Sequence, residues 1–353
     1  MLYIIITLLI ILYILKKELI ETFTSYKICD LKKKPHGITS EIFNENEITK
    51  NNDDFEVYMP CGYNKVENEL LNINLENKKI YALKGCDKIV SKNNLWTILE
   101  TDYGRDIAKT IMPETFLYND NDIELFKKNY KGQSYILKSN KQRKKGITIS
   151  DNLGTILNKN NNNKLIQEFK ESFIINKRKF NLRIYFLIVC KNNTKKVYVH
   201  KNTKCLYTSK NFDNNKLDFD SNITNSYKTN KDIYDTNPFS LEELYEYLKP
   251  TYDTEKLKEK INKIILLFSK AIVKPLCNLN KLKKNINFQL FGIDMLIDKN
   301  MDPYILEVNK GPDMIPKDEK DKRFKKIVLE DIFEKLKIIK TERSNLFKRI
   351  NIE

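Results

Sequence analysis

One stretch near the carboxyl end, residues 287–312, constrains the fold more than any other part of the chain. Its sequence is NFQLFGIDMLIDKNMDPYILEVNKGP. Phe288–Ile297 and Tyr304–Val308 are apolar and rich in residues that favour strands, while residues 298–303 have the Asp, Asn and Pro composition of a turn. We therefore predict two strands that are joined by a tight turn.

Three polar side chains interrupt the apolar strands of this hairpin: Asp294, Glu307 and Asn309. Strand alternation places Glu307 and Asn309 on one face, and a hairpin brings Asp294 close to them. Two carboxylates and an amide oxygen are hard donors that suit Mg²⁺, which in proteins usually accompanies a nucleotide phosphate. The alternative is an ordinary hairpin with solvated acids, but lone charges are seldom placed between buried apolar residues.

The two segments FQLFGIDMLID and ILEVNKGP, in this order, strongly resemble the tubulin–tyrosine ligase-like family of ATP-grasp ligases. The resemblance implies an α+β fold of the ATP-grasp type, in which ATP lies between two lobes, and Mg²⁺ held by Asp294, Glu307 and Asn309. It also implies that Tyr, Glu or Gly, as a free amino acid, is joined to a carboxylate of tubulin or another acidic protein tail. The reaction would use ATP and pass through an acyl-phosphate.

A strand that ends in Lys138 and a basic, glycine-containing loop at residues 142–147 suit a triphosphate clamp, although a solvated surface hairpin has the same pattern. This region resembles the family motif K-P followed by R-G-x-G-I. The resemblance assigns nucleotide binding to Lys138, Arg143, Gly146 and Ile147, while Ser139 and Lys144 depart from the motif.

Further along the chain, Leu165–Phe169 resembles the family hinge whose backbone contacts adenine, so Gln167, Glu168 and Phe169 are candidate nucleotide contacts. Lys179–Arg183 (KFNLR) resembles the motif K-F-D-x-R, with Asn181 in place of Asp. The resemblance implies that Asn181 contacts the nucleotide and that Arg183 stabilises the phosphate or the developing acyl-phosphate charge.

Two more positions carry implied substrate contacts. Lys204 stands where the family usually has an arginine that holds substrate, and a lysine supplies the charge without the bidentate fork. Asn225, in the segment Ile-Thr-Asn, resembles the family's L-T-N and is a candidate ligand of substrate or phosphate.

The amino-terminal run Leu2–Leu15 is almost wholly apolar and is followed by Lys16 and Lys17. It is short for a hydrocarbon core of about 30 Å, yet it lacks the basic start and cleavage site of a signal peptide. We predict that residues 1–21 form a hydrophobic anchor helix that spans a membrane once. Because the lysines follow the span, the catalytic part would be cytosolic.

The expected domains follow from these assignments. They are a membrane anchor at residues 1–21, a tether at 22–54, a small α/β domain at 55–118, an ATP-grasp ligase at 119–340 and a tail at 341–353.

The net charge of +16, from 63 Lys and Arg against 47 Asp and Glu, can attract an acidic partner. The abundance of Lys, Asn and Ile also fits compositional drift, and because no nucleic-acid module is recognisable we expect no nucleic-acid partner.

Six scattered cysteines without a CxxC pair predict no disulfide framework and a reducing compartment. Only two histidines are present, which argues against zinc and Ser-His chemistry.

Three other interpretations remain open at this point, the third of which is a basic nucleic-acid binder. The first is another ATP-grasp enzyme, either a small-molecule carboxylate–amine ligase or an inositol-phosphate kinase. The second is a membrane-anchored pseudoenzyme that binds an acidic partner, which the departures at Ser139, Lys144, Asn181 and Lys204 would favour.

Overall fold

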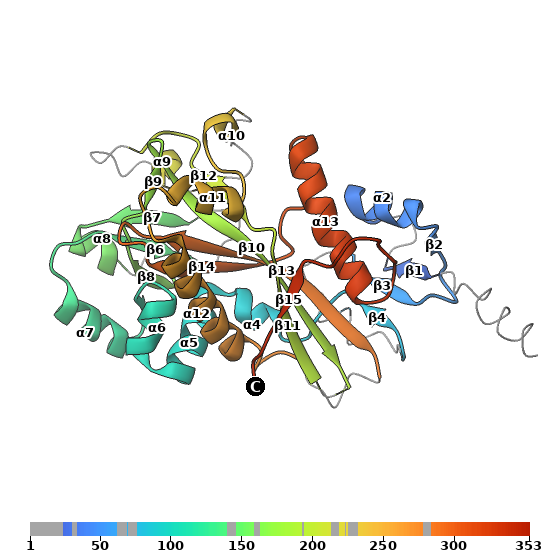
Figure 1. Cartoon of the computed structure of the whole chain (residues 1–353). Coiled ribbons are helices and arrows are strands. Elements are labelled where there is room, and N and C mark those ends of the chain that lie inside the picture. The colour runs from blue at the N-terminus through green and yellow to red at the C-terminus, as the bar shows by residue number, and fades with distance from the viewer. Residues whose placement is uncertain are drawn as a thin grey trace, which may run out of the picture.

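The computed structural model is a mixed structure of helices and strands (Figure 1). It describes residues 24–29, 34–61, 69, 76–139, 146–158, 163–192, 194–212, 219–222, 224, 232–277 and 284–353.

Among the described residues, the larger of two sheets has eleven strands, with the order β15-β11-β10-β13-β4-β3-β1-β2 and with β12, β14 and β9 paired beside this path. It combines an antiparallel part around β10 and β13 with a parallel part at the amino-terminal end. Its strands are β1 (Ser25–Ile28), β2 (Thr49–Lys50), β3 (Val57–Met59), β4 (Lys79–Ile80), β9 (Ile174–Ile175), β10 (Arg178–Lys191), β11 (Thr194–His200), β12 (Lys204–Tyr207), β13 (Ile286–Ile297), β14 (Pro303–Lys310) and β15 (Phe347–Ile350).

The predicted hairpin is confirmed as β13 and β14, which pair antiparallel. Its turn is closed by Asp298, whose side chain accepts hydrogen bonds from the backbone amides of Asn300 and Asp302, and Met301 takes the left-handed conformation that the turn needs. This local side-chain bonding is why Asp is favoured at such a position. The turn fixes the register that places Asp294 directly opposite Glu307.

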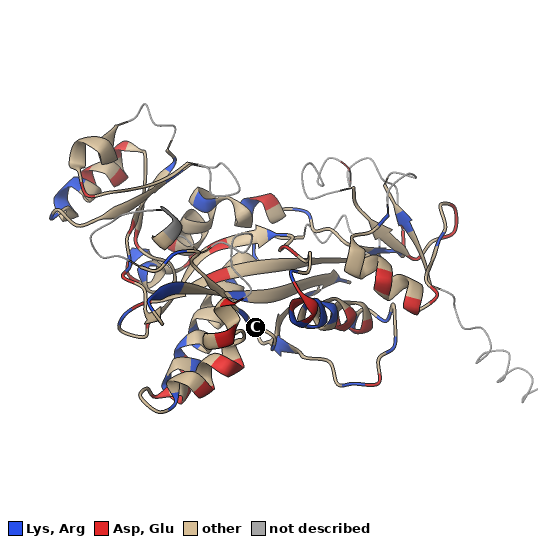
Figure 2. Ribbon diagram, turned by 90° about the horizontal axis from the view of Figure 1, so that it is seen from above, with Lys and Arg blue, Asp and Glu red and all other residues tan. Residues whose placement is uncertain are grey.

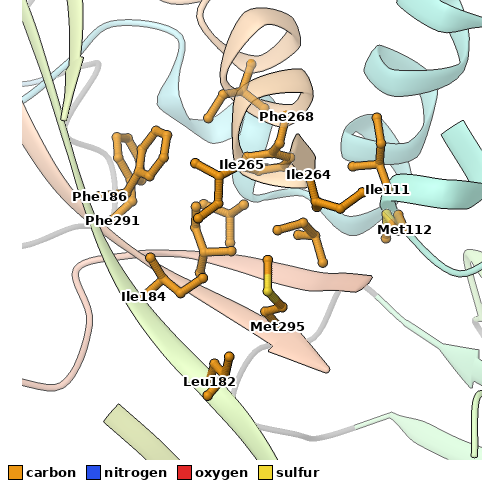
Figure 3. Packing of buried hydrophobic residues seen from close by; sticks show 14 of the residues in the cluster. Ile111, Met112, Leu182, Ile184, Phe186, Ile264, Ile265, Phe268, Phe291 and Met295 are labelled. Atoms are coloured by element: carbon orange, nitrogen blue, oxygen red, sulfur yellow. The ribbon is translucent and has the colours of Figure 1, made fainter. Parts of the chain in front are cut away.

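Helices cover both faces of the large sheet, because its central strands are apolar on both sides. Figure 3 shows the first face, where Ile184 and Phe186 of β10 meet Ile264 and Phe268 of a long helix. The helices of this side are α4 (Cys86–Val90), α5 (Lys92–Tyr103), α6 (Arg105–Ile111), α11 (Leu241–Leu248) and α12 (Thr254–Ile272), with the short α9 (Phe219–Asn222) and α10 (Ile233–Thr236) nearby in the chain.

The opposite face of the sheet packs against α13 (Glu319–Lys335), which in turn contacts α2 (Gly37–Glu45). Lys326 of α13 pairs with Glu41 and Glu45 of α2, so charge as well as apolar burial joins the two helices. The side chains of Tyr185 and Leu187 alternate with those of the first face and belong to this core.

The smaller sheet, as far as the structure describes the chain, has four strands in the order β5-β8-β6-β7, all antiparallel. Its core joins Phe116, Phe126, Tyr135 and Leu137. The elements are β5 (Thr115–Leu117), α7 (Asp120–Asn129), β6 (Tyr135–Lys138), β7 (Ile147–Ser150), α8 (Leu153–Leu157) and β8 (Leu165–Glu168).

The expectation of a tether at residues 22–54 is wrong for the described part of that segment. It contains strand β1, paired in parallel with β2 and β3, and helix α2, which buries Ile42 and Phe43 completely. Although this segment is polar in composition, six of its apolar side chains are buried, and they are enough to attach it to the sheet and to α13. They are Tyr26, Ile28, Ile38, Ile42, Phe43 and Ile48.

The predicted single-pass membrane location is corrected at this point. In the part of the chain that the structure describes, no helix is long and apolar enough to span a bilayer. The segment on which the prediction rested, residues 1–21, lies outside the described residues. The anchor helix, the membrane partner and the inferred cytosolic side are therefore withdrawn.

The cysteine prediction is also wrong, because four of the six cysteines are paired. Cys29 bonds Cys61, and Cys190 bonds Cys277, with Cα–Cα distances of 5.2 and 6.5 Å. Cys86 and Cys205 lie outside these two disulfides and are buried. Pairs that are distant in sequence cannot be found from cysteine spacing alone, and these bonds remove the argument for a reducing compartment.

Candidate functional site

A row of four charged residues crosses four neighbouring strands of the large sheet. Lys204 of β12 is opposite Arg183 of β10, Arg183 is opposite Asp294 of β13, and Asp294 is opposite Glu307 of β14. Directly opposed residues point to the same face of a sheet, so strand register places these four side chains on one face. We call these four residues the charged row.

The centre of the charged row is a two-point contact between Arg183 and Asp294. The Arg183 Nε donates to Asp294 Oδ1 at 2.5 Å and its Nη2 donates to Oδ2 at 3.1 Å. Burial opposes the charge of Arg183, but the Asp294 carboxylate outweighs it and raises the arginine pKa. The bidentate fork holds the guanidinium in one orientation, as a planar fork on a carboxylate does.

The three predicted metal ligands lie together. The Asn309 Nδ2 is 3.4 Å from Glu307 Oε1 and 3.5 Å from Asp294 Oδ2. Burial, with Glu307 as a like-charged neighbour, raises the pKa of Asp294 although Arg183 acts against it. Burial opposes the ionised form of Glu307 too, but Lys92, Lys138 and Arg183 together lower its pKa.

These residues fit a hard divalent cation by their chemistry. Two neighbouring carboxylates, one of them driven toward protonation, are stabilised when a cation lies between them. The amide of Asn309 can turn its oxygen toward the same point, since the two ends of an amide exchange by a rotation. Carboxylate and amide oxygens are the ligands that Mg²⁺ takes in proteins.

Two lysines face Glu307 from other elements. Lys138 ends β6 of the smaller sheet, its Nζ donates to Gln167 Oε1 at 2.5 Å, and burial lowers its pKa to about 8. Lys92, at the start of α5, has its Nζ 3.7 Å from Glu307 Oε2. Sequence reasoning missed Lys92, and no local signal marks it, because a lysine in the first turn of a helix is unremarkable until the fold brings it to the carboxylates.

The predicted hinge residues lie on β8 and just after it. Gln167 is fully buried and its Nε2 donates to Thr115 Oγ1 at 3.0 Å. The backbone amides of Glu168 and Phe169 donate to the carbonyls of Glu114 and Ser134. The backbone N–H groups of Glu168 and Phe169 are therefore already hydrogen-bonded within the protein. A nucleotide base could contact these two residues only through other backbone groups.

Strand β10 adds Lys179 and Asn181 to the same region. The Nζ of Lys179 lies 4.6 Å from the ring centre of Phe169 and 4.1 Å from that of Phe212, and it donates to Asn222 Oδ1 at 2.6 Å. Burial lowers the pKa of Lys179 to about 8. The Asn181 Nδ2 donates to Thr224 Oγ1 at 2.9 Å, so the asparagine that replaces Asp is held by a hydroxyl rather than by a cation.

Lys204 is on the charged row, but its ammonium group is turned away from Arg183. Its Nζ donates to the buried Asp321 Oδ1 at 2.7 Å and lies 4.7 Å from the ring centre of Phe239. Asp321 also accepts a hydrogen bond from Lys325. Burial alone would raise the pKa of the Asp321 carboxyl group, but the two lysines have the larger effect and lower it. The charge of Lys204 is thus already balanced within the fold.

The glycine loop is described only in part. Gly146 has a φ of 76°, and its carbonyl accepts from the amide of Ser139, while Ile147 pairs with Lys138 in the β6–β7 ladder. The other two predicted residues, Arg143 and Asn225, lie outside the described residues.

Comparisons with known proteins agree on one family. A family model described as the tubulin-tyrosine ligase family matches residues 71–346. A tubulin glycylase 3B of Drosophila melanogaster is 27% identical over 274 residues, which cover 69% of this chain and 35% of the relative. A probable alpha-tubulin polyglutamylase of Tetrahymena thermophila is 23% identical over 278 residues, 71% of this chain and 66% of the relative. The matched part is thus less than two thirds of either relative's length.

Proposed function

The chain belongs to the tubulin-tyrosine ligase family, and from that premise we propose that it is an ATP-dependent ligase with an ATP-grasp fold. In the proposed reaction a carboxylate oxygen of a protein acceptor attacks the γ-phosphorus of ATP and ADP leaves. The amine nitrogen of a free amino acid then attacks the acyl carbon, loses a proton and expels phosphate. The acceptor is tubulin or another protein with an acidic tail, since relatives carry names of tubulin-modifying enzymes.

The charged row with Asn309 is the observation that carries this proposal. Asp294, Glu307 and Asn309 would hold Mg²⁺, which when bound neutralises charge on the phosphates. Lys138 and Lys92 face the same carboxylates from two other elements, so cationic groups surround the place where phosphate would lie. Lys138 is held in place by its hydrogen bond to Gln167, and the ammonium group of Lys92 lies 3.7 Å from Glu307 Oε2.

Arg183 has the position and the rigidity of a group that stabilises transferring charge. It lies between the lysine and the acidic end of the charged row, and its two bonds to Asp294 prevent the guanidinium from swinging away. An arginine held in this way contributes without reorganising when charge develops on a phosphoryl or acyl oxygen. We propose this role for Arg183 and nucleotide contacts for Gln167, Lys179 and Asn181.

The division into an α/β domain at 55–118 and a ligase at 119–340 also remains a proposal. The boundary does not follow the two sheets, because β3 and β4 pair within the large sheet and β5 pairs within the smaller one. Within residues 119–340, the smaller sheet carries Lys138 and the large sheet carries the charged row, so the two sheets supply the two sides of the same group of charges. ATP held between two lobes is what this arrangement would provide.

The test is ligation by the full chain with ATP, Mg²⁺ and tubulin in the presence of Tyr, Glu or Gly, read as mass added to tubulin. Glu307→Gln is the inactive variant, and Glu246→Gln, which changes an exposed glutamate on α11, is the matched control. Mass added by the wild type and by Glu246→Gln but not by Glu307→Gln supports the proposal and names the amino acid. Absence of ATP binding in the wild type would contradict it.

One observation favours a second function, a protein that binds ATP or an acidic partner without catalysis. Lys204, the residue expected to hold substrate, is neutralised by Asp321. Binding of Mg·ATP without turnover for any amino acid or acceptor would support this alternative. Turnover with a non-protein acceptor would instead indicate another small-molecule ATP-grasp ligase or a kinase.

A further inference from the structure

A hollow of about 450 Å³ lies at the far end of the large sheet from the charged row. It forms where three chain segments meet: the start of β4, the β10–β11 turn and the start of β13 (Figure 1). Its lining residues are Asn77, Lys78, Lys79, Lys191, Asn192, Lys284 and Ile286. We call it the lysine hollow.

The lysine hollow is strongly cationic. Four of its seven lining residues are lysines and none is acidic. Lys79 already contacts Glu56 and donates to the carbonyl of Lys337 at 3.0 Å. For Lys78, Lys191 and Lys284, no carboxylate among the described residues lies within ion-pair distance. On the helices in Figure 2, by contrast, basic and acidic residues are interspersed.

The backbone around the hollow is organised rather than loose. The Asn285 Oδ1 accepts from the amide of Lys78 at 2.8 Å, and the amide of Ile286 donates to the carbonyl of Lys78 at 2.9 Å. Lining residues Asn77, Asn192 and Lys284 have φ values of 56°, 46° and 61°. Asn adopts this left-handed region more readily than most residues, so Asn77 and Asn192 suit the bends at which the segments converge.

The lysine hollow is separate from the proposed nucleotide site. Lys191 and Arg183 both lie on β10, eight residues apart, and a strand rises about 3.3 Å per residue, which gives a separation of about 26 Å. The same spacing separates Ile286 from Asp294 on β13. A ligand of the hollow is therefore not the ATP that the charged row would bind.

We infer that the lysine hollow binds acidic side chains of the acceptor protein, at a distance from the carboxylate that is modified. The inference rests on the proposed function for the identity of the acceptor. Flexible, hydrated ammonium groups spread around an open hollow suit several dispersed carboxylates on a chain, whereas a single compact anion would favour an aimed fork. An extended peptide would need at least about eight residues to reach from the hollow to the charged row.

Such a second contact would act on the acceptor's affinity more than on the chemistry. Two linked contacts raise the effective concentration of the second group at its site, so a long acidic acceptor would bind more tightly than a short one. Charge complementarity of this kind is weakened by salt.

The test is direct binding of fluorescein-labelled peptides of four and sixteen glutamates to the full chain, measured by fluorescence anisotropy without ATP. The variant is Lys191→Glu/Lys284→Glu. The control is Lys127→Glu/Lys128→Glu. It makes the same change of charge on two exposed lysines of α7, the helix between β5 and β6 of the smaller sheet. Mg·ATP binding is measured for all three proteins.

We expect the sixteen-residue peptide to bind about tenfold more weakly to the hollow variant and within about twofold of wild type to the control. Binding of the four-residue peptide should be weak in all three. Equal loss in both variants, or no loss in either, would overturn the inference. Tight binding of inorganic triphosphate that depends on Lys191 and Lys284, without binding of the long peptide, would also overturn it in favour of a small polyphosphate.

The outcome for Mg·ATP separates this inference from the proposed function. Loss of peptide binding in the hollow variant with unchanged ATP binding supports the inference. If the wild type binds the long peptide through the hollow but does not bind ATP, the ligase proposal fails while the cationic site stands.

Discussion

Gly292 is the position where one methyl group would disturb the charged row most directly. It lies on β13 opposite Asn309, two residues before Asp294. A Cβ added there would lie 2.8 Å from the Cβ of Pro312 and 3.0 Å from the Cδ of Arg183. Apolar carbon atoms pack at about 3.5 Å or more, so these contacts are short by about 0.7 and 0.5 Å.

The expected effect of Gly292→Ala follows from what has to move. Extra volume in a packed site costs roughly 1–3 kcal/mol of stability. If Arg183 shifts by the missing half ångström, its bonds to Asp294, now 2.5 and 3.1 Å, cannot both remain within normal range. Because misplacement by about 1 Å can cost a factor of ~10² in rate, we expect kcat to fall between about tenfold and a hundredfold.

The assay combines ligation kinetics with urea unfolding. We expect the KM for ATP to change little in Gly292→Ala, because Lys138 is on the other sheet and Glu307 keeps its backbone position. The control is Gly37→Ala at the start of α2, where a Cβ would meet nothing within 4 Å; its activity should be unchanged and its stability within about 1 kcal/mol of wild type.

Two results would refute the reasoning about Gly292. One is a Gly292→Ala protein with wild-type kcat and stability, which would mean that Pro312 and Arg183 yield without consequence. The other is a parallel loss of kcat and ATP affinity with a large loss of stability, which would indicate general unfolding rather than displacement of Arg183.

Three further predictions concern other groups. Glu307→Gln removes a charge that three cations face, so ATP turnover should fall at least a hundredfold while the fold survives, and retained Mg²⁺-dependent turnover would contradict the metal assignment. Burial lowers the pKa of Lys138 to about 8, so the free protein loses this positive charge above that pH. The affinity for ATP should therefore stay constant below pH 8 and weaken by up to about tenfold per pH unit above it. An affinity that does not change between pH 7 and 9.5 would argue against phosphate binding by Lys138. Asp331 is fully buried and accepts hydrogen bonds from His200, Arg343 and the backbone amide of Leu346. Asp331→Asn should therefore lower the free energy of unfolding, measured with urea, by about 3 kcal/mol. A loss below about 1 kcal/mol would show that these partners form other hydrogen bonds in the variant.

Residues that are close in sequence could be placed near one another from the pattern alone. The hairpin of β13 and β14, its turn at Asp298 and the grouping of Asp294 with Glu307 and Asn309 follow from strand alternation and local turn chemistry. The apolar residues of α12 likewise recur at helical spacing and form its buried face, a pattern that the sequence carries by itself. These features depend on contacts a few residues apart, and sequence order carries that information.

Groups that meet across long stretches of chain could not be found in this way. The approach of Lys92 to Glu307, the pairing of Lys204 with Asp321, the Cys190–Cys277 bond and the lysine hollow each join segments that lie 87 or more residues apart. Periodicity along the chain predicts on which face of a strand or helix a side chain lies. Which residue it contacts there depends on how the sheets and helices pack. Thus the sequence by itself determined the hairpin with its cluster of oxygen donors, whereas only the tertiary structure decided which cations balance those donors, because charge partners are selected by burial against distant elements.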